Sequence, residues 1–385
     1  MKILVTSLPD LKKIHPQRPH HLLKHLSLNH DITVLCVNAW GVDDHSNEFF
    51  EKHLDNIKFY YASKKKTNSI IQEIYWWKNF KKLDLDSSSF DAHINFNSLI
   101  GGFFFSKKTN LPTLFDVCDD LVEWVSISPQ IPRLLKPLGR LLANFMLKKN
   151  IKASKIVTLS MISLGELFDI PPEKSIIIPN GVDTDLFCKI KKKTLDNHND
   201  INHNDIFTIG FVGFLGDWVD FTPIFRVIKE LKNLDIQMLV VGGGDNRTKF
   251  ENIAKKMGIY DKIEFKGDVE YFEVPNYISL MDVCLLPFDM GKISKGALPL
   301  KLFEYMACEK PVISTPLESV KKSVGNLVLY ADSSEELKNH ITKLCAKENL
   351  RLKLGVEGRY FVKENYDWEK ISVHFEELVY QMKRR

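Results

Sequence analysis

Short apolar runs recur along the whole chain, and polar loops followed by residues at helical spacing separate most of them. The runs at 3–6, 32–37 and 283–286 are rich in Val, Ile and Leu and lack alternating charged residues, which is typical of strands buried on both faces of a parallel sheet. Strands that alternate with helices in this way predict an α/β fold. The same pattern predicts further strands at 94–96, 113–115, 156–160, 176–178, 207–213, 237–241, 263–265 and 311–315.

The length of 385 residues predicts two domains, and the composition changes near the middle of the chain. Residues 188–205 are polar and of low complexity, which is typical of a linker. We therefore divide the chain into an N-terminal domain at 1–183, a linker at 184–205, a C-terminal domain at 206–365 and a final helix at 366–385. That helix carries an apolar stripe made of Ile371, Phe375, Leu378 and Met382.

The formal net charge is +4, and residues 1–183 contain 23 Lys and Arg against 19 Asp and Glu, so the whole excess lies in the N-terminal half. An excess this small does not predict a nucleic-acid partner, but it suits an anionic membrane surface or a phosphorylated acceptor. No apolar run reaches the roughly 18 residues of a transmembrane helix, and the first residues resemble a strand rather than a signal peptide. Six cysteines without a CxxC pair predict free thiols in a reducing compartment.

The segment 283–315 predicts a strand, a loop, a helix that begins near Pro299, and a second strand. Helix N-termini at the carboxyl edge of a parallel sheet favour phosphate groups. Lys301 and Glu304 are three residues apart and therefore lie side by side in this helix. A diphosphate beside Lys301 and a ribose beside Glu304 would explain the two charges. An exposed ion pair worth about 0.2–0.5 kcal/mol explains them equally well.

The residues PLKLFEYMACEKPVIST at 299–315 resemble the donor-site motif of family-4 type glycosyltransferases, which have the GT-B fold. The phrase IPNGVD at 178–183 resembles the segment where the chain of these enzymes crosses between domains. The resemblance implies two Rossmann-like domains that face one another across a cleft, with the final helix crossing back to the first domain. It also implies that Lys301 contacts the diphosphate and Glu304 the ribose of a nucleotide-diphosphate (NDP) sugar.

The same resemblance implies further contacts with the donor. Many relatives carry a glutamate for the donor sugar where this chain has Gly296, and a basic pair of the first loop is absent from 214–220, so Lys301 is expected to neutralise more of the diphosphate. Relatives usually have a small residue where this chain has Glu309, which costs about 1 kcal/mol if its backbone is left-handed. The remaining expected donor-binding residues are Gly213, Gly243, Val269, Leu298, Pro299 and Leu300.

The predicted strand at 113–115 is followed closely by three carboxylates, those of Asp116, Asp119 and Asp120. Like charges this close raise the pKa of at least one group, so Asp119 and Asp120 are candidates for acid–base chemistry. Capping of the next helix by one of them is the alternative. The segment also resembles a D-x-x-D-D stretch found after the corresponding strand in some relatives.

Basic and histidine side chains crowd the start of the first predicted helix, where Arg18, His20 and His21 follow His15. One interpretation places them on the solvated surface. The other places them near an anionic ligand, and on that interpretation Arg18 and His20 are expected on the acceptor side of the site.

Two stretches, 63–82 and 134–152, combine apolar residues at helical spacing with lysines and arginines. Basic amphipathic helices lie in membrane interfaces, so an anionic membrane surface is a possible partner. A helix that faces the core and keeps its charged side in water explains either stretch taken singly.

The resemblance implies a retaining hexosyltransferase that moves a sugar from an NDP-sugar to a glycan or lipid-linked acceptor in cell-surface polysaccharide or glycoconjugate synthesis. Asp119, Asp120 and Lys301 are the expected catalytic residues, and stabilisation of the leaving diphosphate would require no metal. The lack of G-x-G-x-x-G argues against a dinucleotide cofactor, and no other cofactor is expected. We expect a cytoplasmic protein, peripheral on the inner face of the membrane. A non-catalytic sugar-nucleotide binder, a sugar epimerase or phosphorylase, and a scaffold are the alternatives.

Overall fold

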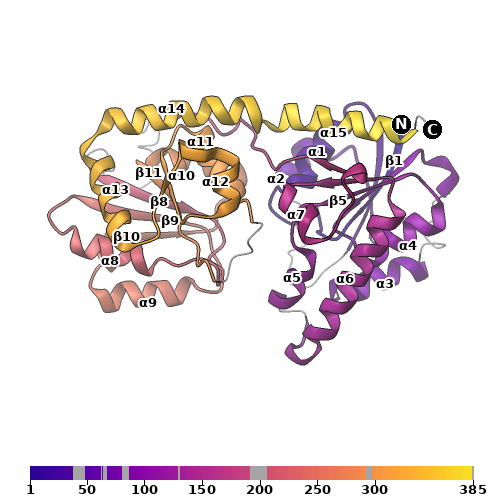
Figure 1. Cartoon of the computed structure of the whole chain (residues 1–385), viewed down its shortest axis with the longest axis horizontal. Coiled ribbons are helices and arrows are strands. Elements are labelled where there is room, and N and C mark those ends of the chain that lie inside the picture. The colour runs from indigo at the N-terminus through magenta and orange to yellow at the C-terminus, as the bar shows by residue number, and fades with distance from the viewer. Residues whose placement is uncertain are drawn as a thin grey trace. The chain divides into compact units, whose positions relative to one another are not determined.

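The computed structural model describes residues 1–37, 48–61, 63, 67–79, 86–128, 131–190, 206–291 and 297–383. The chain divides into two compact units (Figure 1). Unit 1 contains Met1–Asn180 and Trp368–Arg385, and unit 2 contains Gly181–Asp367. Most of the predicted linker, and Gly296, lie outside the described residues.

Unit 1 is built on a parallel sheet of seven strands in the order β3-β2-β1-β4-β5-β6-β7. The central strands are buried along their whole length, as the unbroken apolar runs predict. The strands are β1 (Lys2–Ser7), β2 (Asp31–Cys36), β3 (Lys58–Tyr61), β4 (Ala92–Phe96), β5 (Thr113–Val117), β6 (Ile156–Leu159) and β7 (Ser175–Ile177).

The helices of unit 1 include the last one of the chain, α15, which packs against α1 and the ends of the central strands (Figure 1). The apolar stripe of α15 is buried, Phe375 stacks on Phe96, and Trp368 stacks on His21. The helices are α1 (Arg18–Leu26), α2 (Glu48–His53), α3 (Ser69–Asn79), α4 (Ile100–Thr109), α5 (Leu121–Ile127), α6 (Lys136–Ala153), α7 (Ile162–Leu167) and α15 (Trp368–Lys383).

Unit 2 is built on a six-stranded parallel sheet in the order β10-β9-β8-β11-β12-β13. Its strands are β8 (Phe207–Val212), β9 (Ile236–Val241), β10 (Ile263–Gly267), β11 (Val283–Leu286), β12 (Val312–Ser314) and β13 (Leu329–Tyr330). Its helices are α8 (Thr222–Glu230), α9 (Arg247–Met257), α10 (Val274–Leu280), α11 (Leu300–Ala307), α12 (Glu318–Val324), α13 (Ser334–Ala346) and α14 (Glu348–Asn365).

Both strand orders reverse direction once, between β1 and β4 in unit 1 and between β8 and β11 in unit 2. Helices of right-handed crossovers cover opposite faces on either side of such a point and leave a crevice at the carboxyl ends of the strands, where α/β sheets bind ligands. The prediction of two Rossmann-like α/β domains is therefore confirmed, and in each unit a ligand is expected at the carboxyl edge of the sheet.

The end of α11 has the left-handed residue that the sequence suggested, because Glu309 has a φ of 56°. The Lys310 amide donates to the Tyr305 carbonyl and the Glu309 amide to the Met306 carbonyl, each at 3.0 Å, which is a Schellman motif. Helix α14 passes close to this end, and a Cβ atom at Gly355 would lie 2.1 Å from the Glu309 carbonyl oxygen. The glycine therefore permits the contact between the two helices.

The substitution Gly355→Ala is expected to lower the free energy of unfolding by about 1–3 kcal/mol, because the methyl group would meet backbone. Gly358→Ala is the matched control on the same helix, since its Cβ would meet Met306 side-chain atoms at an ordinary 3.5 Å. That control should leave stability unchanged or raise it by up to about 1 kcal/mol. Urea unfolding of the full chain measures both, and equal effects of the two changes would contradict the proposed contact.

Candidate active site

Helix α11 carries the charged pair of unit 2 at the carboxyl edge of the sheet. Pro299 precedes its first residue, and Leu302, Phe303 and Met306 are buried as their spacing predicts. The buried Tyr305 hydroxyl accepts from the Val212 amide at 2.7 Å and lies 3.2 Å from the Val212 carbonyl. Tyr305, which sequence reasoning did not single out, thus fixes α11 to the end of β8.

Lys301 and Glu304 contact one another, with the Lys301 ammonium donating to the Glu304 carboxylate at 2.7 Å. The pair is not the exposed surface pair considered above, because only 7% of the Glu304 side chain and 28% of the Lys301 side chain are exposed. Burial, together with the charges of Glu304 and Asp183, raises the pKa of the neighbouring Tyr271. Lys301 thus neutralises a carboxylate in an already negative, half-buried environment.

The glycine loops after β8, β9 and β10 pack on one another. The Gly213 amide donates to the Val241 carbonyl at 2.9 Å, and the Gly243 amide donates to the Asp268 carboxylate at 2.7 Å. A Cβ atom on Gly243 would lie 2.4 Å from Asp268. The space beside Gly243, an expected donor-binding residue, is therefore occupied by the Asp268 side chain in this structure.

The other expected donor-site residues lie at the same edge of the sheet. Val269 is half-buried just after β10, Leu298 is buried, and Pro299 and Leu300 are half-buried at the start of α11. A cavity of about 170 Å³ lies at the carboxyl ends of β11, β12 and β13, beneath the starts of α8 and α13. The expected donor residues do not line that cavity, so it gives no support to their assignment.

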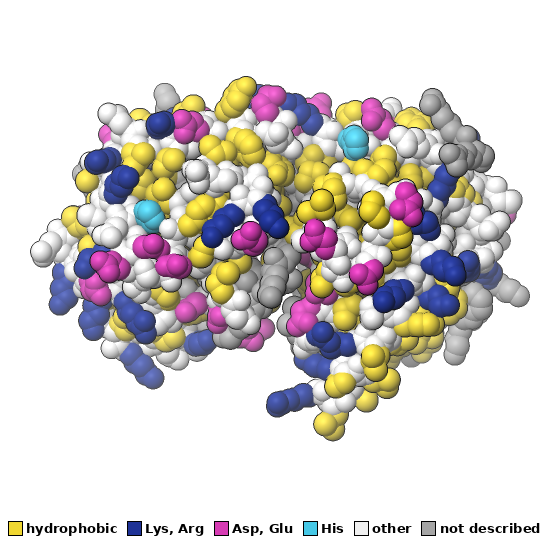
Figure 2. All heavy atoms as spheres, viewed as in Figure 1, with side chains coloured by type: hydrophobic (Ala, Val, Ile, Leu, Met, Phe, Trp, Pro, Cys, Tyr) yellow, Lys and Arg dark blue, Asp and Glu magenta, His cyan; other side chains and the backbone are white. Residues whose placement is uncertain are grey.

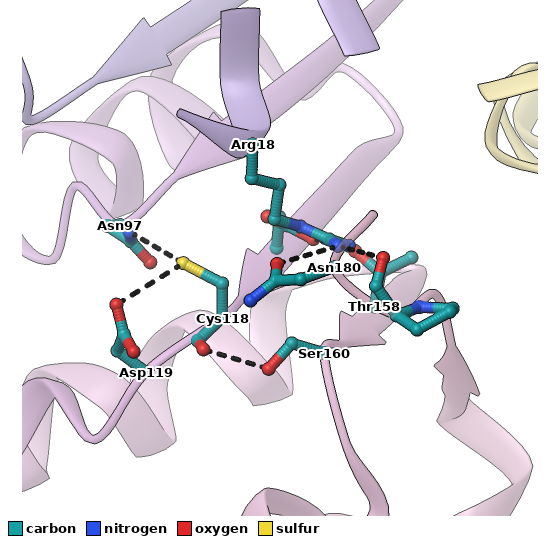
Figure 3. A network of polar contacts seen from close by, with 9 residues as sticks. Arg18, Asn97, Cys118, Asp119, Thr158, Ser160 and Asn180 are labelled. Atoms are coloured by element: carbon teal, nitrogen blue, oxygen red, sulfur yellow. Dashed lines mark hydrogen bonds and ion pairs between the residues drawn. The ribbon is translucent and has the colours of Figure 1, made fainter. Parts of the chain in front are cut away.

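A buried ion pair organises the carboxyl edge of unit 1 (Figure 3). The Arg18 guanidinium donates twice to the Asp116 carboxylate, both at 2.8 Å, and once to the Pro179 carbonyl at 2.8 Å. The Thr158 hydroxyl donates to the same carboxylate at 2.6 Å. Arg18 is only 2% exposed, and these hydrogen bonds join the start of α1 to the ends of β5 and β6 and to the 179–180 segment. Its expected role on the acceptor side stays a prediction.

His20 is also buried, which excludes the solvated surface for this residue, and its expected role on the acceptor side stays a prediction. Its Nδ1 accepts from the Gln17 amide at 3.1 Å, and its Nε2 donates to the Leu11 carbonyl at 2.8 Å. Burial lowers its pKa to about 4, so the ring is neutral. The residue stabilises the start of α1, and among the clustered histidines His15 is exposed while His21 is buried.

The two neighbouring aspartates have different environments. Asp120 caps α5, because its carboxylate accepts from the amides of Val122 at 3.1 Å and Glu123 at 2.8 Å. Asp119 still reaches solvent, yet desolvation by the surrounding protein raises its pKa to about 6. The capping alternative therefore holds for Asp120, and Asp119 is the carboxylate that suits acid–base chemistry.

Three strand ends meet beside Asp119, and sequence reasoning missed two of their residues (Figure 3). Asn97 follows β4 and donates from Nδ2 to the Cys118 sulfur, which follows β5, at 3.2 Å. Ser160 follows β6 and donates to the Cys118 carbonyl at 2.8 Å. The available signal was positional, since polar residues just past neighbouring parallel strands share one edge.

No group of three or more His, Cys, Asp or Glu side chains in the described part of the chain could hold a metal ion. None of the described helices is both long and apolar enough to cross a bilayer.

The sequence of this chain is similar to sequences of known glycosyltransferases. Residues 192–361 match the family model described as glycosyl transferases group 1. The chain is 29% identical over 177 residues to an uncharacterized glycosyltransferase, MJ1069, of Methanocaldococcus jannaschii, a match that covers 44% of this chain and 43% of the relative. It is 21% identical over 211 residues to a GDP-mannose-dependent phosphatidylinositol monomannoside mannosyltransferase of Mycolicibacterium smegmatis, covering 52% and 55%. The chain thus spans about half the length of the curated relatives it matches.

The fold itself matches solved structures along nearly the whole chain. The structure of HepE from Anabaena in complex with UDP-glucose superposes with a TM-score of 0.72, covering 99% of this chain and all of that one at 15% identity. The match establishes a fold of two Rossmann-like units. The family-model match at 192–361 lies within unit 2.

Replacing Asp116 is expected to show that the ion pair holds unit 1 together. Asp116→Asn leaves the Arg18 guanidinium buried without a counter-charge and should cost about 3–5 kcal/mol of unfolding free energy. Glu123→Gln is the matched control, because Glu123 pairs with Arg140 where both side chains are 44% exposed, and should cost less than about 1 kcal/mol. Urea unfolding separates the two, and a loss below about 1 kcal/mol for Asp116→Asn would refute the assignment.

Proposed function

We propose that this protein is a glycosyltransferase that moves a sugar from an NDP-sugar to a glycan or lipid-linked acceptor. The observation that carries the proposal is the half-buried Lys301–Glu304 pair at the start of α11, beside the switch point of a sheet in the segment matched by the group 1 family model. The relative from Mycolicibacterium smegmatis, named for a GDP-mannose donor, and the HepE complex with UDP-glucose support a nucleotide-sugar donor.

In the proposed reaction an acceptor oxygen forms a bond to the anomeric carbon, and the bond from that carbon to the diphosphate breaks. Negative charge collects on the leaving diphosphate, where Lys301 and the amides at the start of α11 stabilise it. Glu304 accepts hydrogen bonds from the ribose. Lys301 must then exchange at least part of its contact with Glu304 for the diphosphate. We propose that the donor sugar is a hexose and that its configuration is retained, as the sequence resemblance implies. In a single displacement, retention requires the acceptor oxygen to enter on the face of the sugar from which the diphosphate leaves. NMR of the product decides both.

Asp119 is the residue that we assign as acceptor of the proton from the attacking hydroxyl. A general base works best when its pKa lies near the working pH, and a pKa of about 6 meets that condition. Since the base must be ionised, turnover is expected to rise with pH through about 6. Asp120, whose carboxylate is used by α5, has no such role.

A sugar-nucleotide binder without transfer is the second candidate. It is favoured by the Asp268 carboxylate, which occupies the Gly243 amide, and by the absence of Lys and Arg from the loop at 214–220. Hydrolysis of a panel of NDP-sugars separates the two, because a binder gives a thermal shift without turnover and a transferase gives both.

We also propose an anionic membrane as a partner of unit 1. One side of α6 is buried through Leu147 and Ile151, but Leu134 beside its start and Leu138 and Leu141 along it are 93%, 66% and 70% exposed. Helix α3 also carries exposed apolar residues, Ile70, Ile71, Ile74 and Tyr75. Figure 2 shows hydrophobic and basic side chains together on the part of unit 1 where Figure 1 places α5 and α6. Apolar contact plus basic charge suits an interface with anionic lipids.

Calorimetry with NDP and with the matching nucleoside tests the donor site. Lys301→Ala should weaken NDP much more than nucleoside, because only NDP has the diphosphate. Glu304→Gln should weaken both about equally, by roughly 1.5–3 kcal/mol, because both contain the ribose. The exposed pair Lys353 and Glu357 on α14 provides the control, and Lys353→Ala should change neither affinity. Small equal losses for Lys301→Ala and the control would remove the donor assignment.

Sedimentation with anionic vesicles tests the membrane surface. Reversing Lys148 and Lys149, both exposed on α6, to Glu should weaken binding markedly, and added salt should weaken binding of the native chain. The control reverses Lys255 and Lys256, an exposed adjacent pair on α9 of unit 2, and alters net charge by the same amount. Equal weakening by both double changes would show that total charge, rather than this surface, governs binding.

A further inference from the structure

Asn97 has an energetically unfavourable backbone conformation and side-chain environment, and the proposed reaction assigns it no role. Its φ of 58° is left-handed, and this backbone conformation costs asparagine more free energy than it costs glycine. Its Oδ1 atom is buried and has no hydrogen-bond partner among the described residues, while Nδ2 donates to the Cys118 sulfur at 3.2 Å. Rotating the side-chain amide by about 180° would place its NH2 group, in place of the oxygen, in the position without a partner. Costs of this kind, concentrated on one residue, are found at functional sites.

The contact from Asn97 determines where the Cys118 thiol points. Because an N–H group faces the sulfur, the sulfur acts as acceptor there and its hydrogen must be directed elsewhere. The acceptor within reach is the Asp119 carboxylate, whose Oδ2 is 3.8 Å from the sulfur. Burial, followed by the charges of Asp119 and Asp116, raises the pKa of the thiol, which therefore stays protonated as a donor. Figure 3 shows this sequence of contacts from Asn97 through Cys118 to Asp119.

The backbone at this place is fixed as well. Ser160 holds the Cys118 carbonyl, and the capping contacts of Asp120 hold the chain directly after Asp119. With the backbone fixed on both sides, the hydrogen bond from the Cys118 thiol sets the direction of the Asp119 carboxylate.

We propose that Asn97 and Cys118 are positioning residues, which orient the Asp119 carboxylate toward the attacking hydroxyl of the acceptor. The inference rests on the proposed function, because only a transferase needs Asp119 as a base. Asn97 supplies the direction of the thiol, and the thiol supplies a hydrogen bond to the ionised carboxylate.

The titration of Asp119 tests the contact without relying on turnover. Within unit 1, the charged and titratable groups acting on it are Arg18 at the start of α1, Asp116 on β5, Asp120 at the start of α5, and the Cys118 thiol. Carbon-13 NMR of labelled aspartate carboxyl groups, with the signal assigned by its loss in Asp119→Asn, gives the midpoint directly. The native midpoint is expected near 6.

Removing the thiol in Cys118→Ala should raise this midpoint by roughly 0.5–1 pH unit, because a hydrogen bond to the charged form is lost. Cys118→Ser retains a donor and should restore the midpoint. Asn97→Gly accepts the left-handed backbone without strain, removes the amide, and should shift the midpoint in the same direction as Cys118→Ala. An unchanged midpoint in both Cys118→Ala and Asn97→Gly, in chains that remain folded by circular dichroism, would overturn the inference.

Hydrolysis of UDP-glucose distinguishes a failure of this inference from a failure of the proposed function on which it rests. If the inference holds, Asp119→Asn abolishes the rise of kcat with pH, and Cys118→Ala moves that rise upward with little change in KM. If Asp119→Asn retains full turnover, Asp119 is not the base, and the inference is overturned together with that role. If the midpoints shift as expected but UDP-glucose is not hydrolysed, the contact between Cys118 and Asp119 is supported, and the same assay with GDP-mannose tests Asp119 as the base. If neither donor is hydrolysed, the role of Asp119 as the base is overturned.

Discussion

The buried ion pair between Arg18 and Asp116 sets the geometry of the carboxyl edge of unit 1. A guanidinium that is removed from water requires a matched carboxylate, and here both groups are almost fully enclosed. Through Pro179 and Thr158 the pair also fixes the segment that leaves the unit and the end of β6. Cys118 and Asp119 follow Asp116 by two and three residues, so their positions depend on this pair.

Unit 2 fixes its polar edge by holding α11 at several points rather than by a buried charge. Tyr305 attaches the middle of the helix to β8, and the left-handed Glu309 ends it in a Schellman motif. Arg359 of α14 donates to the Ala307 carbonyl at the same end and to the Phe187 carbonyl nearby. The first turn, with Lys301 and Glu304, is therefore presented by a rigid element, as precise contacts with a ligand require.

Individual residues show how far local reasoning reached. The spacing of Lys301 and Glu304 correctly placed them side by side, because neighbours on a helix are set by its period. Capping by Asp120 was one of two alternatives, and local hydrogen bonds decided for it. Sequence reasoning did not show that Arg18 and His20 are buried, because burial depends on what packs above a residue. Asn97 was missed because its partner, Cys118, lies just past the neighbouring strand β5.

The sequence by itself determined the order of strands and helices, the division into α/β units, and the helix that bears Lys301 and Glu304. Each of these follows from local spacing, since apolar periodicity, caps and turns act over a few residues. Only the tertiary structure decided that Arg18 meets a carboxylate 98 positions away, and that Asn97, Cys118 and Asp119 form one connected group. Those contacts depend on which strands are neighbours and in what register, and no local pattern in the chain specifies that pairing.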